Sequence, residues 1–417
     1  MRAESVPISA PRADPARPLL RSAVVGTGFV GPFHVDAVRR GGYAEVVAIV
    51  GSDEERTRAR AATLGVARGT ADIGSILADP SIDVIHVCTP NRTHVELAIA
   101  VLEAGKHLVL EKPAALDSVA ARGLADLAGR RGRHAVVALT YRGYPMVRRA
   151  RALVRAGEAG DLRLIHGGYI QDWLASASDY NWRLEPEAGG ASRAVADIGT
   201  HWFDTAEFIS GLRVEAVFAD LATFITHRTR PLTAAAAFAS ADGPTEEVAV
   251  RSEDAAMILF RFEGGARGAA AISQVSPGRK NAFQLEFAGS KATLDWDQED
   301  AERLWVRGRD EARLLTRGAK DGPAPGPGIP SLPAGHPEGW AEALRDLLRP
   351  FYAAIAFGVA PTEEPDEAPY PTLADGARGV AFVEAVLESA RAARWVPLPR
   401  GGAPSGEPRN GGRYCAS

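Results

Sequence analysis

A glycine-rich run near the amino terminus constrains the fold of this chain more than any other feature. The run, Gly26-Thr-Gly28-Phe-Val-Gly31, follows the apolar residues 22–25 and precedes a helix-like segment at residues 32–40. In such a run the first glycine makes a tight turn, the second lets the backbone approach a pyrophosphate, and the third lets the helix pack on the strand. The helix N-terminus then faces the anion. The run therefore predicts a dinucleotide-binding turn, although glycine turns also occur in folds that bind no nucleotide.

Short apolar runs alternate with helix-like segments as far as residue 139. The runs are rich in Val, Ile and Leu and show little alternation, as expected of strands buried on both faces. They span residues 22–25, 45–50, 83–88, 106–110 and 134–139. The helix-like segments span residues 32–40, 54–64, 73–77, 93–104 and 118–130. This succession predicts right-handed crossovers and an α/β domain with a doubly wound, parallel Rossmann sheet.

After residue 141 the pattern changes to one dominated by strands. Expected strands span residues 163–170, 214–224, 255–262, 266–274, 281–287, 291–296 and 303–306, and expected helices span 147–156, 340–356 and 373–391. The turns at Gly264 and Gly289 predict hairpins. Residues 257–262 and 284–287 partly alternate, so we expect one face of this sheet to be solvated or to lie against a partner. The pattern predicts an α+β domain built on a mostly antiparallel open sheet.

The length of 417 residues also favours two domains, because single cores rarely exceed about 250–300 residues. We expect a Rossmann domain at residues 22–141 and a substrate-binding and oligomerisation domain at 142–398. Residues 321–333 have the composition of a Gly/Pro loop. The tails at residues 1–21 and 399–417 have the composition of disordered segments.

Composition and charge exclude several classes of protein. The net charge of −4 argues against a nucleic-acid partner. Neither a signal peptide nor an apolar stretch of membrane-spanning length is present, so we expect a cytoplasmic protein without membrane contact. The two cysteines cannot form a disulfide framework, and Cys88, inside an apolar run, is expected to be a buried thiol. No metal site is predicted.

The end of the second expected strand leaves the choice of dinucleotide open. An acidic residue there usually binds the ribose hydroxyls, but this strand ends in Val50-Gly51-Ser52-Asp53. Small residues leave room for a 2′-phosphate, with Ser52 as a donor and Arg56 as a nearby cation. Alternatively, Asp53 turns back to the ribose. We expect NAD as the cofactor, with NADP as the alternative.

Two motifs follow expected strands and carry polar groups to the carboxyl edge of the sheet. Thr89-Pro90-Asn91 would meet a nicotinamide ribose there, or would simply cap a helix after a stiffened turn. Glu111-Lys112-Pro113 follows the next buried strand. Lys112 is either a solvated charge or, because Pro113 restricts the backbone, a rigidly held ammonium that stabilises a developing alkoxide.

A third motif, Asp197-x-x-x-His201, has helical spacing that places both side chains on one face. A histidine ordinarily titrates in the range that a general base needs, which makes His201 a candidate base, and Asp197 would orient it or bind a substrate hydroxyl. The alternative is a capped helix with a half-buried histidine.

Taken together, these three motifs and the glycine run resemble the glucose–fructose oxidoreductase/inositol dehydrogenase/MocA (Gfo/Idh/MocA) family, in order and spacing from about residue 22 to 394. The resemblance implies hydride transfer between a sugar or cyclitol hydroxyl and nicotinamide. It implies that Lys112 activates the reacting oxygen, that His201 is the acid/base with Asp197 beside it, and that Thr89, Asn91 and His94 contact the cofactor. The predicted cofactor-binding residues are Gly26, Gly28, Phe29, Val30, Gly31, Ser52, Thr89, Pro90, Asn91, His94, Glu111 and Lys112.

The residues before the histidine motif suggest a carbohydrate substrate. Sugars favour amides, carboxylates, guanidinium groups and flat aromatic faces, although Trp173 and Trp182 also suit an ordinary core. The predicted substrate-binding residues are Lys112, Gln171, Asp172, Trp173, Trp182, Arg183, Asp197 and His201. The segment His336 to Trp340 is a weaker candidate for the same cavity. A neutral pyranose, an anhydrosugar or a cyclitol fits this set.

The resemblance leaves two other functions open. Some family members cleave glycosides through transient oxidation by the bound cofactor, and others bind the dinucleotide as regulators without turnover. The family also implies a homodimer or homotetramer built through the open sheet.

Overall fold

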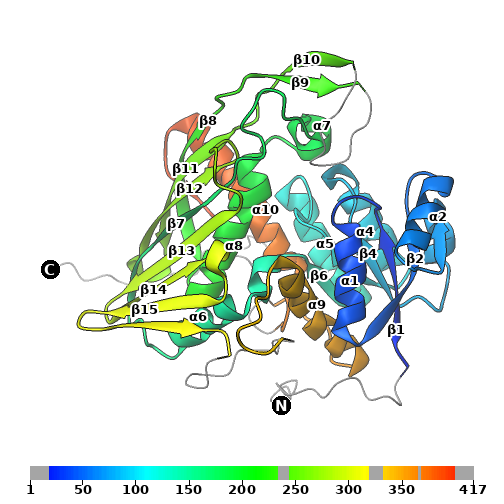
Figure 1. Ribbon diagram of the computed structural model, residues 1–417, viewed down its shortest axis with the longest axis horizontal. Coiled ribbons are helices and arrows are strands. Elements are labelled where there is room, and N and C mark those ends of the chain that lie inside the picture. Colours follow the sequence, from blue (N-terminus) through cyan, green and yellow to red (C-terminus); the bar gives the residue numbers. More distant parts are fainter. Residues whose placement is uncertain (1–17, 233–243, 319–331, 365–367, 400–417) are drawn as a thin grey trace, which may run out of the picture.

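Six parallel strands form the first sheet of the computed structural model, which describes residues 18–232, 244–318, 332–364 and 368–399 (Figure 1). The strands are β1 (Leu20–Val25), β2 (Ala44–Val50), β3 (Arg68–Thr70), β4 (Val84–Val87), β5 (His107–Leu110) and β6 (Ala135–Val137). Their order is β3-β2-β1-β4-β5-β6, the doubly wound arrangement. The order reverses between β1 and β4, whose carboxyl ends pair at Val25 and Val87. In open α/β sheets, ligands bind beyond such a switch point.

Helices connect these strands and confirm the predicted Rossmann fold. They are α1 (Gly31–Gly41), α2 (Glu54–Thr63), α3 (Ile73–Leu77), α4 (His94–Glu103) and α5 (Ser118–Arg131). Three of them begin at an aspartate, Asp53, Asp72 or Asp117, whose carboxylate accepts a backbone N–H of the first turn. Strand β3 was not predicted, because three residues with the sequence Arg-Gly-Thr carry neither the length nor the apolar character of a strand signal.

A nine-stranded sheet forms the other half of the molecule, in the order β16-β15-β14-β13-β7-β12-β11-β8-β17. Its strands are β7 (Leu162–Ile170), β8 (Val214–Ala222), β11 (Ala255–Phe262), β12 (Arg267–Ser273), β13 (Ala282–Gly289), β14 (Ala292–Asp297), β15 (Arg303–Gly308), β16 (Ala312–Thr316) and β17 (Val396–Pro397). Every neighbouring pair is antiparallel except β7 and β12, which are parallel. The predicted mostly antiparallel sheet and its two hairpins, β11–β12 and β13–β14, are confirmed.

The two faces of this sheet differ. Helices α6 (Pro145–Arg155) and α8 (Thr200–Ser210) cover one face (Figure 1), where Trp202 stacks on Phe260 with ring centroids 5.0 Å apart. On the other face, side chains of β11 are exposed at alternate positions, among them Met257 (63%) and Leu259 (47%). The predicted alternation is therefore present, and one face of the sheet is open in the single chain.

The two predicted C-terminal helices are confirmed and contact both halves of the molecule. Helix α9 (Trp340–Ala356) packs on α1, with the rings of Phe33 and Trp340 5.2 Å apart. Helix α10 (Leu373–Ala392) packs against α5 and β8. Because the last part of the chain packs on both sheets, the boundary between residues 141 and 142 stays a prediction.

Several shorter elements were not predicted. They are strands β16 and β17, the antiparallel pair of β9 (His227–Pro231) and β10 (Thr245–Ala249), helix α7 (Pro186–Gly189), a π-helical turn (Val195–Gly199) and the 3-10 turns Asn91–Thr93, Thr140–Gly143, Trp182–Leu184, Glu263–Gly265 and Gln298–Asp300. Most of both predicted tails, most of the loop at 321–333 and Cys415 lie outside the described residues. Cys88 is a buried free thiol, as expected. Within the described ranges, no helix is long and apolar enough to cross a membrane.

A buried ion-pair network joins elements that pack between the two sheets. The Arg142 guanidinium donates to Asp204 at 2.5 Å and to Asp375 at 2.8 Å, which ties the 3-10 turn after β6 to α8 and α10. Removing one partner from a buried pair leaves an uncompensated charge and costs about 3–5 kcal/mol. Arg142 is the cation shared by Asp204 and Asp375, so Arg142→Met leaves both carboxylates without it, and we expect this variant to lower the free energy of unfolding in urea by about that amount.

Asp300→Ala serves as the matched control. It removes the partner of Arg303 in an exposed pair, for which about 1 kcal/mol or less is expected. Equal losses of stability in the two variants would contradict this account of the network.

Candidate active site

A cavity of about 1720 Å³ opens beyond the carboxyl ends of β1, β2, β4 and β5 and reaches the first residues after β7. Small-ligand sites typically enclose about 300–1,000 Å³, so this cavity has room for a dinucleotide and a second small molecule. It brings together most of the predicted site residues. Those lining it are Gly26, Gly28, Phe29, Val30, Ser52, Thr89, Pro90, Asn91, Glu111, Lys112, Gln171, Asp172, Trp173, Trp182, Arg183, Asp197 and His201. Gly31 and His94 are not among the lining residues.

The glycine turn fits a bound pyrophosphate. Gly26 has a φ of +117°, and a Cβ there would lie 2.4 Å from the Cys88 carbonyl oxygen. A Cβ at Gly28 would meet nothing within 4 Å, because this glycine faces the cavity. Helix α1 begins directly after, and Val30 at its N-cap has no side-chain acceptor for the first-turn N–H groups. Open space beside an uncapped helix N-terminus is the donor set that an anion requires.

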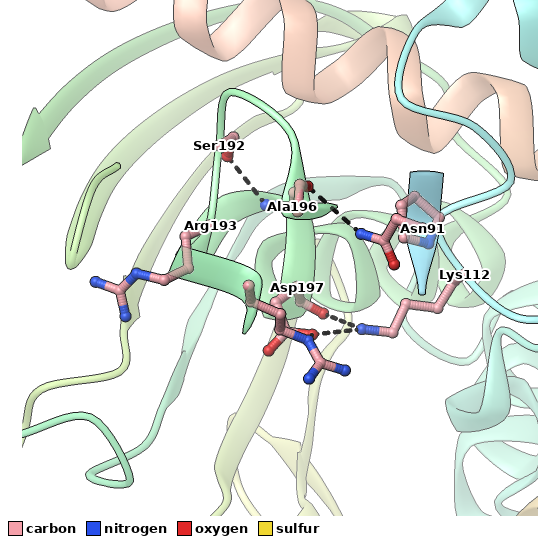
Figure 2. Close-up of a pocket in the computed structure, with 9 residues that line it drawn as sticks. Asn91, Lys112, Ser192, Arg193, Ala196 and Asp197 are labelled. Carbon is pink, nitrogen blue, oxygen red and sulfur yellow. Dashed lines mark hydrogen bonds and ion pairs between the residues drawn. The ribbon is translucent and has the colours of Figure 1, made fainter. Parts of the chain in front are cut away.

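Lys112 and Asp197 form an ion pair across the cavity. The Lys112 ammonium donates to Asp197 Oδ1 and to the Asp197 carbonyl oxygen, both at 2.7 Å. Figure 2 shows the lysine side chain extended from the loop after β5 toward the turn that carries Asp197. The Lys112–Pro113 peptide bond is cis. Lys112 is therefore held against a carboxylate instead of being a solvated charge.

Two further groups hold the Asp197 carboxylate. Arg183 Nε lies 3.2 Å from Oδ1, and the Gln274 amide donates to Oδ2 at 2.8 Å. Burial alone would raise the pKa of Asp197, but the Lys112 and Arg183 cations lower it well below its ordinary value. Asp197 is therefore a carboxylate throughout the neutral range.

His201 lies one turn after Asp197, at the start of α8. Asp197 and the two residues after it belong to the π-helical turn Val195–Gly199, a feature that occurs often at functional sites, and α8 begins at Thr200. In the described part of the chain, no hydrogen bond joins the two side chains; the His201 ring instead packs edge-on against Tyr141, with centroids 5.0 Å apart. Burial and the Lys112 charge lower the pKa of His201 to about 3. The ring is therefore a neutral imidazole at the cavity wall.

The far end of the cavity is lined by amide and aromatic groups. The Trp173 indole donates to Gln171 Oε1 at 2.9 Å, and the Gln171 amide donates to Asn281 Oδ1 at 2.8 Å. Tyr169 donates to the same Asn281 oxygen at 2.6 Å. These bonds fix the orientation of the Gln171 side chain toward one wall of the cavity.

Charged side chains also line the far end of the cavity. The exposed Lys280 pairs with Asp172 at 2.7 Å, and the Arg183 guanidinium lies 4.5 Å from the centre of the Trp182 ring. Of the weaker candidates, Trp340 lines the cavity, whereas His336 does not.

His94 supports the site from beneath. It is fully buried, and its two ring nitrogens lie 2.7 Å from the Pro113 carbonyl oxygen and 2.8 Å from the Thr89 carbonyl oxygen. Instead of contacting the cavity, as the resemblance implied, it joins the two strand-end motifs to one another. This arrangement suits a residue that positions Lys112.

Glu111 continues into a buried hydrogen-bond chain. The His34 ring donates to the Glu111 carboxylate at 2.9 Å, and the chain runs on through His86 to Tyr352. It joins α1, β4, β5 and α9 directly beneath the cavity. Sequence reasoning missed His34, His86 and Tyr352, because single polar residues inside apolar segments give no local signal of their partners.

Similarity to known proteins agrees with this geometry. Residues 20–139 match a family described as oxidoreductases with an NAD-binding Rossmann fold, and residues 147–295 match the GFO/IDH/MocA C-terminal domain. Levoglucosan dehydrogenase from Pseudarthrobacter phenanthrenivorans is 32% identical over 362 residues, which cover 84% of this chain and 89% of that protein.

Two solved structures are similar over almost the whole chain. A levoglucosan dehydrogenase in complex with NADH and levoglucosan has a TM-score of 0.81 at 29% identity, covering 92% of this chain and 100% of its own. An inositol dehydrogenase homologue from Azotobacter vinelandii, in complex with NADH and myo-inositol, has a TM-score of 0.78 at 28% identity, covering 92% and 98%.

The low pKa of His201 predicts a pH-dependent loss of stability. Its pKa is about 3 in the folded chain and 6.5 ordinarily, so the unfolded chain binds more protons between these values. The stability linked to His201 is complete above pH 6.5 and is lost as the pH falls. Between pH 8 and 5.5, the free energy of unfolding of the unmodified protein should fall by roughly 1 kcal/mol more than that of His201→Asn.

The exposed His227 provides the control, and His227→Asn should lose as much stability over this interval as the unmodified protein. If His201→Asn behaved like His227→Asn, His201 would not be held neutral by the fold.

Proposed function

Because this chain belongs to the Gfo/Idh/MocA family of oxidoreductases, we propose that it transfers a hydride between a hydroxyl-bearing carbon of a sugar or cyclitol and a nicotinamide dinucleotide. One observation carries the proposal: the glycine turn, the Lys112 ammonium and the neutral His201 imidazole line the same cavity. The relatives named for levoglucosan and inositol support a polyhydroxylated substrate. NADH in both of those structures supports NAD as a cofactor.

Separate groups of residues would bind the pyrophosphate and the nicotinamide end of the dinucleotide. The turn at Gly26–Gly28 and the start of α1 would hold the pyrophosphate, and Thr89, Pro90 and Asn91 would lie near the nicotinamide end. When bound, the nicotinamide ring accepts or returns the hydride. The chain itself must bind the sugar, stabilise charge on the reacting oxygen and move one proton.

Lys112 and His201 take the two chemical roles. An ammonium has three N–H donors, and Lys112 gives two of them to Asp197. The third is left to donate to the reacting oxygen, where it stabilises negative charge as that oxygen loses its proton. The neutral His201 ring is the form that accepts the proton in oxidation. Asp197 positions Lys112 and does not titrate in the neutral range.

The other end of the cavity favours a neutral sugar. Gln171 and Asp172 offer amide and carboxylate groups to ring hydroxyls, while Trp173 and Trp182 offer flat faces to C–H groups. This set is the basis for proposing a pyranose, an anhydrosugar or a cyclitol as the substrate class.

Replacing either chemical group tests the proposal. With a sugar and NAD or NADP, Lys112→Met and His201→Ala should each lower turnover at least about a hundredfold, the scale expected for one charge-stabilising or acid–base group. The measurement is the rate of appearance of reduced-nicotinamide absorbance over a panel of sugars and cyclitols.

Lys291→Met is the control, because Lys291 donates to the Gly157 carbonyl oxygen away from the cavity. Near-unchanged rates in the Lys112 or His201 variant would overturn the assignment. Release of a sugar from a glycoside without accumulated reduced cofactor would show a glycosidase, and dinucleotide binding without turnover would show a regulator.

We also propose that the open face of the nine-stranded sheet joins copies of this chain into a homodimer or homotetramer. Met257 and Leu259 on β11 and Leu164 on β7 are exposed there, and an apolar sheet face of this kind is normally covered by a partner. Light scattering should give a mass of at least twice 44.1 kDa for the unmodified protein. The double variant Met257→Lys, Leu259→Glu should be a monomer.

Val119→Glu is the control, since Val119 is exposed on α5 in the other half of the chain. It should leave the mass unchanged. A monomeric unmodified protein would refute the proposed assembly.

A further inference from the structure

A loop carries much of the cavity wall that faces the proposed sugar. Residues 171–181, all of which the structure describes, form neither helix nor strand and connect β7 to the 3-10 turn after them. Because such a segment has no ladder of its own, its position depends on the groups that its backbone bonds to. The residues in or just after this loop that line the cavity are Gln171, Asp172, Trp173, Asp179, Trp182 and Arg183.

A buried guanidinium holds the 171–181 loop. Arg228, on β9, donates to the Leu174 carbonyl oxygen at 2.9 Å. It also donates to the carbonyl oxygens of Ser176 at 2.9 Å and Asp179 at 3.1 Å. The planar fork of an arginine can serve several acceptors at once, and bonds from a charged donor are stronger than neutral ones. Arg228 therefore fixes the path of the loop at three points.

Backbone bonds hold the same loop between two other elements. The Thr229 N–H of β9 donates to the Ala177 carbonyl oxygen at 2.9 Å. The Leu174 N–H donates to the Gln274 carbonyl oxygen, just after β12, at 3.1 Å. Strand β9 pairs with β10 as a sheet separate from the two larger ones (Figure 1). The β9–β10 pair thus supports a loop that belongs to the cavity.

Arg228 is anchored by a carboxylate that also serves the ion pair of the site. Arg228 pairs with Asp254 Oδ1 at 3.0 Å, and Arg193 pairs with the same oxygen. All three side chains are fully buried. From Arg193 the network continues through Gln274 to Asp197. The network therefore divides at Asp254 into one branch to the 171–181 loop and another to the carboxylate that pairs with the ammonium.

The two branches can be separated by substitution. Without Arg228, Asp254 would keep Arg193 on Oδ1, and its Oδ2 would still accept the backbone N–H groups of Phe224 at 2.7 Å and Ile225 at 2.8 Å. The carboxylate would not become an uncompensated buried charge, which is the costly case. The three loop carbonyls, by contrast, would lose their charged donor.

From these contacts we infer that Arg228 is a positioning residue for the sugar, which holds the 171–181 loop so that Asp172 and Trp173 stand at the cavity wall. It sets the affinity for the substrate and takes no part in hydride transfer. The inference rests on the proposed function, because it requires a sugar or cyclitol at this wall. It adds a residue that, in the described part of the chain, is not among those lining the cavity.

Steady-state kinetics of Arg228→Met, with the sugar or cyclitol that the unmodified chain turns over fastest, test the inference. KM for that substrate should rise at least about tenfold, the scale of one hydrogen bond to a charged donor. Turnover at saturation should stay within about threefold, because a loss of substrate affinity alone leaves kcat unchanged. The dissociation constant of NAD⁺, measured by calorimetry without a sugar, should stay within about twofold.

Amide hydrogen exchange reads the position of the loop without any activity. In Arg228→Met, peptides from residues 171–181 should exchange at least about tenfold faster than in the unmodified chain, because local opening costs less free energy once the charged donor is gone. Peptides from α1 and β5, in the other sheet, should exchange as before.

Arg317→Met is the matched control for lost stability. The Arg317 guanidinium is also buried, pairs with Glu302 at 2.6 Å and donates to loop carbonyl oxygens, among them that of Leu332 at 2.9 Å. None of the described residues 332–336 lines the cavity. This variant should lose stability in urea as Arg228→Met does, but leave KM and the exchange of residues 171–181 unchanged.

Two further variants separate the branches. Arg228→Lys keeps a positive charge beside Asp254 without the planar fork, so it should show the same rise in KM at unchanged kcat, but a smaller one. Gln274→Met breaks the other branch, which holds Asp197, and should lower kcat.

An unchanged KM or unchanged loop exchange in Arg228→Met would overturn the inference and leave the proposed function standing. An equal rise of KM in Arg317→Met would also overturn it, because the effect would then follow from stability alone. A fall in kcat at constant KM in Arg228→Met would do the same. Absence of turnover of every sugar and cyclitol by the unmodified chain would instead overturn the proposed function and, with it, this inference.

Discussion

The ion pair between Lys112 and Asp197 is the interaction on which the arrangement of the site depends. It joins the loop after β5 to the turn before α8, and the two side chains are 15% and 14% exposed. Charges withdrawn from water in this way are stable only when their remaining donors and acceptors are satisfied. Asp197 meets this requirement through Lys112, Arg183 and Gln274. The cavity is therefore built around a carboxylate that belongs to one half of the chain and an ammonium that belongs to the other.

A second layer of buried polar groups holds Asp197 in place. Gln274 donates to Asp197 with its amide and accepts from Arg193 at 3.1 Å with its carbonyl. Arg193 in turn pairs with Asp254. Glu253 accepts from the Ser192 hydroxyl and from the backbone N–H groups of Arg193 and Val195 at the start of the π-helical turn. This turn is thus capped by a carboxylate distant in sequence, and a buried polar network of this kind restricts the arrangement of its side chains.

The sequence predicted the features that depend on residues close together in the chain, and it did not predict contacts between residues far apart in the chain. The parallel sheet, the glycine turn and the two hairpins follow from patterns a few residues long, and all were predictable. The spacing of Asp197 and His201 predicted that both side chains lie on one helix face, with Asp197 orienting His201 or binding a substrate hydroxyl. Residues 195–199 instead form a π-helical turn, and the Asp197 carboxylate bonds to Lys112, 85 residues earlier. His34, His86 and Tyr352 show the same limit, because the bond between His86 and Tyr352 joins segments 266 residues apart. In a single sequence, the residues that flank each partner give no indication of such a contact.

The separation of His201 from a carboxylate partner has a chemical consequence. Burial and the positive charge of Lys112 lower the pKa of His201, so the free enzyme keeps this ring in the form that accepts a proton. In the proposed oxidation, negative charge develops on the oxygen that Lys112 contacts and offsets the field of the ammonium. The pKa of His201 then rises as the oxygen becomes charged. In the reverse direction the same coupling lowers the pKa as charge on the oxygen disappears, and His201 releases its proton. In the proposed reaction, Lys112 therefore controls both the charge of the reacting oxygen and the proton affinity of the base.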